Sequence, residues 1–239
     1  MDSDEYCRQL EAHLCRRNGG HLIRIVGAAF SIVQDWFTKG IPFKVARQGI
    51  DRHVDRATAR GPRRRPIRLE FCDADVQDAF DQWRRAVGLQ AADLAPGVSG
   101  DAAEDEPPAR GRTSLPAHLD RVITRLTALR TGPSVSEPWS CALEDATRSV
   151  DALQARARRA RGEARDVIVA ELAEIDHVLM TAAARTVPAE VLSETGTEAE
   201  QELVPFRGRL AIADYAAALD RSRVRVLRVR LALPTVAFD

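Results

Sequence analysis

Apolar side chains recur at helical spacing along most of the 239-residue chain. Intervals of three and four residues between apolar positions place them on one face of an α-helix. In the first ninety residues this pattern predicts helices over 3–17, 28–38, 42–59 and 73–87. Glycines and a proline separate these stretches, as in "NGG" at 18–20 and "GIP" at 40–42. The chain is therefore expected to begin with a compact multi-helix module.

A longer apolar seam follows in the second half of the chain. Between residues 114 and 131 the apolar intervals are four, three, four and three, which is a heptad pattern. The pattern continues over 137–185 and gains an extra step near Gly162, where we expect a stutter or a break. This half is predicted to form a long helical hairpin or bundle. Its seam residues are Leu115, Leu119, Val122, Leu126, Leu129, Val150, Leu153, Ala157, Ala160, Ala164, Ile168, Leu172, Ile175, Leu179 and Ala182.

Two stretches are ambiguous. Residues 67–71, "IRLEF", alternate and predict a short strand or strand-like approach, after which Asp73 is expected to cap a helix. Residues 223–231, "RVRVLRVRL", also alternate, so helix and strand both remain open there, although the helical context favours helix. The final apolar residues, "ALPTVAF" at 232–238, are expected to fold back onto the protein.

The stretch 92–113 is rich in Pro, Gly, Ala and acidic residues, which is typical of a flexible linker. It divides the chain into a basic multi-helix module over 1–91, a linker over 92–113 and a helical hairpin or bundle over 114–239. The predicted fold class is all-α. Within the first module, Gly49 is positioned to allow a close crossing of two helices.

Charge changes the picture only locally. The 35 basic and 35 acidic residues cancel, so the whole chain is not expected to behave as a polyelectrolyte binder. Only Lys39 and Lys44 are lysines, and the remaining basic residues are arginines, which suit phosphate and carboxylate. No apolar leader or membrane-length apolar run is visible, so a cytoplasmic protein with reduced thiols is expected.

Motifs for catalysis are not found in the sequence. The five histidines are far apart, none forms HxxxH, and no CxxC pair, phosphate loop or nucleophile elbow occurs. We therefore expect no catalytic residues, no metal site and no cofactor. An enzyme whose catalytic side chains are brought together only by the fold remains a further hypothesis.

One stretch has a strong local charge. Residues 44–68 hold nine basic side chains against Asp51 and Asp55, which gives a net charge of +7. A basic helix face that leads into a basic turn, "GPRRRPIR" at 61–68, is typical of a phosphate-binding surface. The candidate nucleic-acid-binding residues are Arg52, Arg56, Arg60, Arg63, Arg64, Arg65 and Arg68.

These observations favour a non-enzymatic binding or adaptor protein that grips nucleic-acid phosphates through 44–68, with a partner or second copy docking on 114–185. The alternative is a purely structural interaction protein that uses its C-terminal helices, with the basic stripe meeting an acidic partner such as its own "DAAEDE" at 101–106. In a third interpretation the stripe is only a solvated surface, with its arginines paired to neighbouring carboxylates.

Two segments also carry a resemblance. "DWFTKGIPFKVARQGIDR" at 35–52 and "RRRPIRLEFC" at 63–72 resemble a W-x3-GIP…GID…RR…YC pattern found in uncharacterised, mostly helical bacterial proteins. "VPFRGRL" at 204–210 and "ALPTVAF" at 232–238 resemble the same group. The first segment, with Trp83, is also similar to DnaD-type helical domains of replication initiation proteins. The resemblance implies a helical fold and assigns no catalytic residue.

Overall fold

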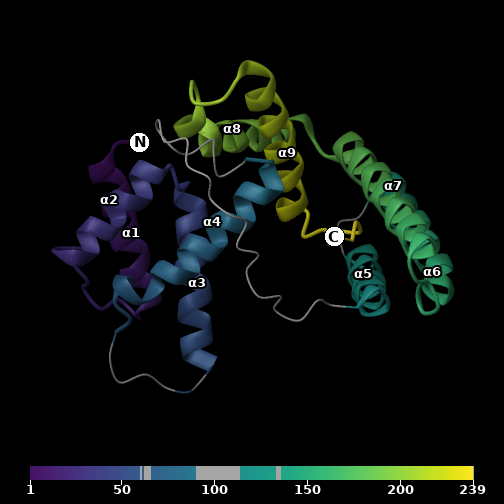
Figure 1. Ribbon diagram of the computed structural model, residues 1–239, viewed down its shortest axis with the longest axis horizontal. Helices are drawn as coiled ribbons and strands as arrows, with labels where there is room; N and C mark the ends of the chain where they lie inside the picture. The colour runs from purple at the N-terminus through teal and green to yellow at the C-terminus, as the bar shows by residue number, and fades with distance from the viewer. Residues whose placement is uncertain (60, 62–65, 90–113, 133–135, 239) are drawn as a thin grey trace. The chain divides into compact units, whose positions relative to one another are not determined.

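The computed structural model describes residues 1–59, 61, 66–89, 114–132 and 136–238. Within these ranges the chain is helical and contains no β-strand, which confirms the all-α prediction (Figure 1). The α-helices are α1 (Ser3–Arg17), α2 (Ala28–Lys39), α3 (Phe43–Ala59), α4 (Asp73–Val87), α5 (Leu115–Arg130), α6 (Glu137–Ala157), α7 (Glu163–Thr186), α8 (Ala189–Leu203) and α9 (Ile212–Arg230), with 3-10 helices η1 (Leu69–Cys72) and η3 (Val204–Phe206).

Local chemistry sets the ends of the first helices. The Asp2 carboxylate accepts a hydrogen bond from the Glu5 backbone N–H at 2.8 Å, which caps the start of α1. Gly40 ends α2 in the left-handed conformation with φ of 78°. A Cβ on Gly40 would also lie 2.9 Å from the Cβ of Pro205. The predicted stop at Gly40 is confirmed, and its lack of a side chain also admits the segment that follows α8.

The segment 67–71 forms no strand: Arg68 is extended, with φ of −89° and ψ of 151°, but Leu69–Cys72 form a 3-10 helix. The Asn18 side chain hydrogen-bonds both backbone groups of Ile67. Its Nδ2 donates to the Ile67 carbonyl at 3.1 Å, and its Oδ1 accepts from the Ile67 N–H at 2.7 Å. Backbone groups satisfied in this way need no neighbouring strand. Leu69 and Cys72 are both buried, and their spacing of three residues requires a helical turn rather than alternation.

Asp73 begins α4 as predicted, but its carboxylate does not cap the helix. Its Oδ1 accepts a hydrogen bond from the Trp36 indole Nε1 at 2.7 Å. Trp36 is completely buried, and a buried indole N–H without an acceptor would be costly. The carboxylate therefore joins α2 to α4 instead of stabilising a helix terminus.

The chain divides into two compact units. The first comprises Met1–Ser99 and Glu198–Arg223, and the second comprises Gly100–Thr197 and Val224–Asp239. The sequence-based division assigned all of 114–239 to one C-terminal bundle. The structure instead groups Glu198–Arg223 with the N-terminal helices, because Leu203, Phe206 and Ala218 are buried in the first hydrophobic core.

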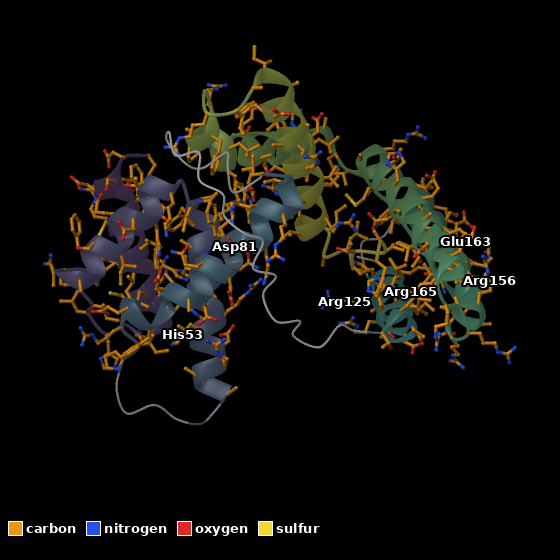
Figure 2. The ribbon with its side chains drawn as sticks, in the orientation of Figure 1. His53, Asp81, Arg125, Arg156, Glu163 and Arg165 are labelled. Atoms are coloured by element: carbon orange, nitrogen blue, oxygen red, sulfur yellow. The ribbon has the colours of Figure 1, made fainter. Side chains whose placement is uncertain are left out.

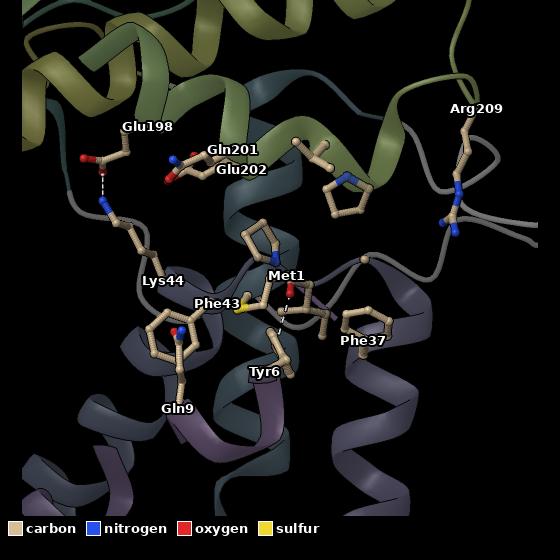
Figure 3. Close-up of a pocket in the computed structure, with 15 residues that line it drawn as sticks. Met1, Tyr6, Gln9, Phe37, Phe43, Lys44, Glu198, Gln201, Glu202 and Arg209 are labelled. Atoms are coloured by element: carbon tan, nitrogen blue, oxygen red, sulfur yellow. Dashed lines mark hydrogen bonds and ion pairs between the residues drawn. The ribbon is translucent and has the colours of Figure 1, made fainter. Parts of the chain in front are cut away.

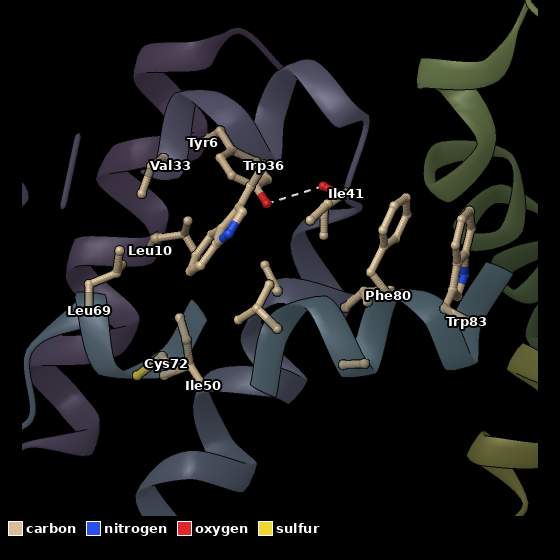
Figure 4. Close-up of a cluster of buried hydrophobic side chains, with 14 of the residues drawn as sticks. Tyr6, Leu10, Val33, Trp36, Ile41, Ile50, Leu69, Cys72, Phe80 and Trp83 are labelled. Carbon is tan, nitrogen blue, oxygen red and sulfur yellow. Dashed lines mark hydrogen bonds between the residues drawn. The ribbon is translucent and has the colours of Figure 1, made fainter. Parts of the chain in front are cut away.

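The first core lies among α1, α2, α3 and α4 (Figure 4). Its largest fully buried side chains include Tyr6, Leu10, Trp36 and Ile50. The closest approach is between α3 and α4: a Cβ added to Gly49 would lie 2.5 Å from the Cα of Val76. The close crossing predicted at Gly49 therefore occurs, and it is possible only because this position has no side chain.

A buried polar network holds the returning segment on the first core. The Glu202 Oε2 accepts hydrogen bonds from the Trp83 indole N–H and from the Ser222 hydroxyl, each at 3.1 Å. The Trp83 ring also lies 5.6 Å from the ring of Phe206. The carboxylate therefore links α8 to α4 and α9, and the ring contact adds η3.

The second unit is built on the heptad seam. Asp120 contacts Gln154, and Arg130 Nη1 lies 3.2 Å from Glu144 Oε2, so α5 and α6 run antiparallel. The predicted break occurs at 158–162 between α6 and α7, where Gly162 has φ of 51°. Of the predicted seam residues, Leu119, Leu126, Val150 and Leu172 are buried in one core, together with Leu143, which the seam did not include. Ala164, which the seam did include, is exposed in the first turn of α7.

The C-terminal segment completes the second core. Residues 223–230 are helical: Val226 and Leu227 are buried, whereas Val224 and Val229 are 45% and 69% exposed, which alternation would not produce. The apolar tail folds back as expected, with Leu233 and Val236 buried. Asp176 fixes it, since its Oδ1 accepts from the Arg228 guanidinium at 2.9 Å and from the Val236 N–H at 2.8 Å.

Other arginines of this unit also hold its surface together (Figure 2). Arg156 makes two hydrogen bonds to Glu171, at 2.8 and 2.9 Å, and thereby joins α6 to α7. The Arg165 guanidinium lies 5.5 Å from the centre of the Phe238 ring, a cation–π distance.

A helix that crosses a membrane must have both sufficient length and sufficient hydropathy. No helix in the described part of the chain meets both requirements.

The close crossing at Gly49 can be tested by the sign of the change in unfolding free energy when Gly49 is replaced by alanine. Alanine in a helix interior is normally about 1 kcal/mol more favourable than glycine. We expect Gly49→Ala to lower the free energy of unfolding by ~1–3 kcal/mol, because the new methyl meets the backbone of α4. Urea denaturation followed by circular dichroism measures the change. A variant as stable as the natural protein would show that α3 and α4 are not in this contact.

The seam predicts a different outcome for Leu126, which is fully buried in the second unit. Truncation of a buried leucine to alanine typically costs about 2–5 kcal/mol, and a buried aspartate without a partner costs more. We expect Leu126→Asp to unfold the second unit while the indole signals of Trp36 and Trp83 keep their folded NMR positions. Ala128→Asp, at an exposed position of the same helix, should unfold neither unit. Native-like signals throughout the Leu126→Asp variant would contradict the seam.

Candidate functional site

The basic stripe over 44–68 begins on α3, which carries Lys44, Arg47, Arg52 and Arg56. Arg68 precedes η1 and is exposed. Three of the seven candidate residues, Arg52, Arg56 and Arg68, are thus placed by the structure. The other four, Arg60, Arg63, Arg64 and Arg65, lie outside the described residues.

Arg56 is anchored to α4. Its Nη2 donates to the Asp75 Oδ2 at 2.6 Å, and the His53 Nδ1 lies 2.8 Å from the same oxygen. The Asp75 side chain is 8% exposed, whereas that of Arg56 is 51% exposed. Burial alone would raise the pKa of Asp75, but the hydrogen bonds from Arg56 and His53 outweigh it and lower that pKa below its ordinary value. A buried carboxylate therefore holds one terminal nitrogen of a half-exposed arginine side chain.

The opposite side of α3 carries a second set of ion pairs. Asp51 and Asp55 both pair with Arg17 of α1, and the Arg17 Nε lies 2.9 Å from the Asp51 Oδ1. The His13 Nε2 lies 2.8 Å from the same Asp51 oxygen. The sequence led us to weigh pairing of Asp51 and Asp55 with arginines one turn away on α3. The structure pairs them with α1 instead, so they are not the partners of Arg52.

The remaining charges of the stripe fall into two groups. Lys44 pairs with Glu198 at 2.5 Å, and Arg68 pairs with Glu70 at 2.7 Å. Arg47 and Arg52 have no ion-pair partner among the residues that the structure describes. Arg52 lies one turn before Arg56 on the same helix. The described part of the stripe thus holds two arginines without an ion-pair partner, Arg47 and Arg52, and Arg52 stands next to the anchored Arg56.

The sequence did not indicate that Arg17 and Asp75 contact the stripe, nor that His53 within it contacts Asp75. Their contacts join residues 19 to 38 positions apart, so no helical spacing marks them. One feature of the sequence could have indicated Asp75. It stands next to Val76, on the side of α4 that the apolar pattern predicts to be buried, and a buried carboxylate requires a partner. Pattern alone does not say which cation such a residue meets.

A pocket of about 620 Å³ lies elsewhere in the first unit (Figure 3). Its lower wall comes from α1 and the region where α2 leads into α3, and its upper wall comes from the end of α8 and the segment through Arg209. The lining residues are Met1, Tyr6, Gln9, Phe37, Gly40, Ile41, Pro42, Phe43, Lys44, Glu198, Gln201, Glu202, Val204, Pro205 and Arg209. Among the members of the basic stripe that the structure describes, only Lys44 lines this pocket.

The thiols and carboxylates of the described chain form no group of three or more side chains able to hold a metal ion. The cysteines are unpaired, and Cys7 and Cys72 are buried. Burial raises the pKa of the Cys72 thiol to about 12, with smaller contributions from Asp75 and Glu70. A thiol with so high a pKa is a poor nucleophile near neutral pH.

Comparisons of the chain with protein-family models, with curated proteins and with solved structures find no match.

The His13–Asp51 pair gives a pH-dependent prediction. Burial lowers the pKa of His13 below 6.5, and the nearby charges of Arg47 and Arg16 act in the same direction against the Asp51 hydrogen bond. The unfolded chain therefore takes up this proton at a higher pH than the folded chain. Stability should fall as the pH drops below 6.5, because the unfolded state binds more protons in that window.

We expect His13→Gln to reduce the loss of unfolding free energy between neutral pH and pH 5, measured by urea denaturation at a series of pH values. His21→Gln, at an exposed position, should leave the pH dependence of the natural protein unchanged. An equal pH dependence in the His13→Gln variant would show that the buried imidazole does not control it.

Proposed function

We propose that this chain is a non-enzymatic binding protein whose first unit contacts nucleic-acid phosphates through the basic stripe 44–68. The observation that carries the proposal is the pair of neighbouring arginines on α3. Arg52 has no ion-pair partner among the described residues, and Arg56 stands one turn further on with half of its side chain exposed. The helix then leads into the four arginines of "GPRRRPIR".

The ion pair of Arg56 with Asp75 supports this proposal rather than opposing it. A guanidinium carries five N–H donors, and the contact with Asp75 uses an Nη2 hydrogen. The remaining donors stay exposed on a side chain whose position is fixed. A phosphate that meets such a group finds it already oriented, so less side-chain freedom is lost on binding.

The composition of the stripe favours the duplex backbone over single strands. No aromatic side chain interleaves with the arginines of 44–68, since Phe43 and Phe71 lie outside this range. Single-strand binding depends on aromatic stacking platforms as well as charge. Arginines without such platforms contact phosphates, which fixes position on the duplex without reading its sequence.

The non-enzymatic part of the proposal rests on what the two His–Asp pairs do. His13–Asp51 joins α1 to α3, and His53–Asp75 joins α3 to α4. Each aspartate also holds an arginine, Arg17 or Arg56. Such a group is an ion-pair cluster between helices, which accounts for its geometry without a catalytic role.

A second candidate is a structural interaction protein whose stripe meets an acidic partner. The observation in its favour is that the arginines of this region already bind carboxylates, as Arg68 does with Glu70. The heptad seam over 114–185 is buried within the second unit. A partner or second copy docking there would contact the other faces of those helices.

A salt titration separates the two candidates. Each phosphate neutralised on duplex DNA releases counterions, so the logarithm of the binding constant should fall linearly with the logarithm of salt concentration. With the full chain and a short fluorescent duplex, we expect Arg52→Gln to reduce this slope by about 0.9. Joint replacement of Arg63, Arg64 and Arg65 by alanine should reduce it by up to about three times as much.

The matched control is Arg8→Gln, which removes the same charge from an exposed arginine near the start of α1. It should leave the slope unchanged, and circular dichroism should show equal helicity in all variants. Undetectable binding at low salt, or equal loss with Arg8→Gln and Arg52→Gln, would contradict the proposal. Binding of polyglutamate but not of duplex DNA would establish the second candidate instead.

A further inference from the structure

The pocket of the first unit has the size of a small-molecule site. Its volume of about 620 Å³ falls within the roughly 300–1,000 Å³ typical of ligand pockets. Its walls come from segments far apart in the chain, near residues 1–9, 37–44 and 198–209. A ligand held here would contact both the N-terminal helices and the returning segment.

The floor of the pocket is aromatic. The Tyr6 ring makes edge-on contacts with Phe37 and Phe43, with centroid distances of 5.7 and 6.2 Å. The Tyr6 hydroxyl is already used, since it donates to the Ile41 carbonyl at 3.1 Å. Phe37 and Phe43 are only partly buried, so each keeps ring surface that the protein does not cover. This floor favours an apolar body that packs against rings.

The charged side chains of the lining differ in whether the protein already supplies their ion-pair or hydrogen-bond partners. Lys44 is paired with Glu198, at one side of the pocket. The Glu202 carboxylate is buried and accepts hydrogen bonds from Trp83 and Ser222. Arg209 lies on the side away from Lys44 and Glu198 and has no ion-pair partner among the described residues (Figure 3). Among the described lining residues, Arg209 is therefore the charged group whose hydrogen-bond donors are left for a ligand.

We propose that this pocket binds a small amphipathic carboxylate, with its apolar body against the uncovered ring surface of Phe37 and Phe43 and its carboxylate on Arg209. A guanidinium binds a carboxylate through two parallel hydrogen bonds, which gives both strength and orientation. An ammonium ligand would find Glu198 occupied by Lys44 and the Glu202 oxygen occupied by Trp83 and Ser222. The arginine and the aromatic rings thus both favour a carboxylate with an apolar body.

The probes for this proposal share one apolar body and differ in their polar head. Naphthalene-2-carboxylate, its carboxamide and naphthalen-2-ylmethylammonium are titrated into the full chain, and amide chemical shifts report affinity and location. We expect saturable shifts at Phe43 and Gln201, with the carboxylate binding at least about tenfold more tightly than the carboxamide, as a charge-assisted hydrogen bond provides. The ammonium compound should bind more weakly than both.

Arg209→Gln should abolish the preference for the carboxylate and leave the carboxamide affinity unchanged. Arg207→Gln is the matched control: it removes an exposed arginine from the same segment but not from the pocket lining, and the preference should persist. Since both side chains are exposed, the spectra of both variants should remain those of the folded protein. Val204→Trp, which fills the pocket from its rim, should weaken both naphthalene ligands.

Several results would overturn the proposal. These are no saturable binding of the carboxylate, equal affinity for carboxylate and carboxamide, or tighter binding of the ammonium compound. Unchanged carboxylate affinity in Arg209→Gln would place the anion elsewhere, and unchanged affinity in Val204→Trp would place the whole ligand elsewhere. Either result also refutes the assignment.

Discussion

The buried carboxylate of Glu202 is the interaction on which the arrangement of the first unit depends. A carboxylate removed from water is costly unless hydrogen-bond donors surround it, and here Trp83 and Ser222 both donate to one of its oxygens. Trp83 belongs to α4, and Glu202 lies 119 positions later in the chain. This contact, with the tilted ring contact between Trp83 and Phe206, holds the end of α8 and η3 on the N-terminal helices. The upper wall of the pocket, including Arg209, follows from it.

The elements of the fold were largely predictable, and the pairing of distant elements was not. Apolar intervals of three and four identified the helices from α1 to α7, and glycine chemistry identified the end of α2 and the crossing of α3 with α4. They did not identify α8, and they left the second half of α9 open between helix and strand. Periodicity states that one face of a helix is buried, but it does not name the surface that buries it. Leu203 and Phe206 were therefore assigned to the C-terminal bundle, although both are fully buried in the first core. The error at 67–71 had a related cause, because Asn18 satisfies that backbone from 49 residues away.

The candidate site was predictable in position but not in its charge balance. A count of charges within 44–68 treats Asp51 and Asp55 as the carboxylates that neutralise part of the stripe's basic charge. In the folded chain those two carboxylates belong to Arg17, whereas Asp75, Glu70 and Glu198 come from outside the stripe to hold Arg56, Arg68 and Lys44. The exchange leaves Arg52 unpaired among the described residues and fixes Arg56 in place. Local net charge therefore located a basic surface, while the ion pairs that shape it depend on tertiary contacts that spacing does not encode.

A double-mutant cycle between Trp83 and Glu202 tests most directly whether this buried contact holds the first unit together. Trp83→Phe removes the indole N–H and keeps an aromatic ring, and Glu202→Leu replaces the carboxylate by an apolar side chain. The free energy of unfolding of the first unit is measured for the natural protein, both single variants and the double variant. The account predicts a coupling of about 1.5–3 kcal/mol, the net value of a hydrogen bond to a charged group. Additive effects within about 0.5 kcal/mol would contradict it, because residues that do not interact behave independently.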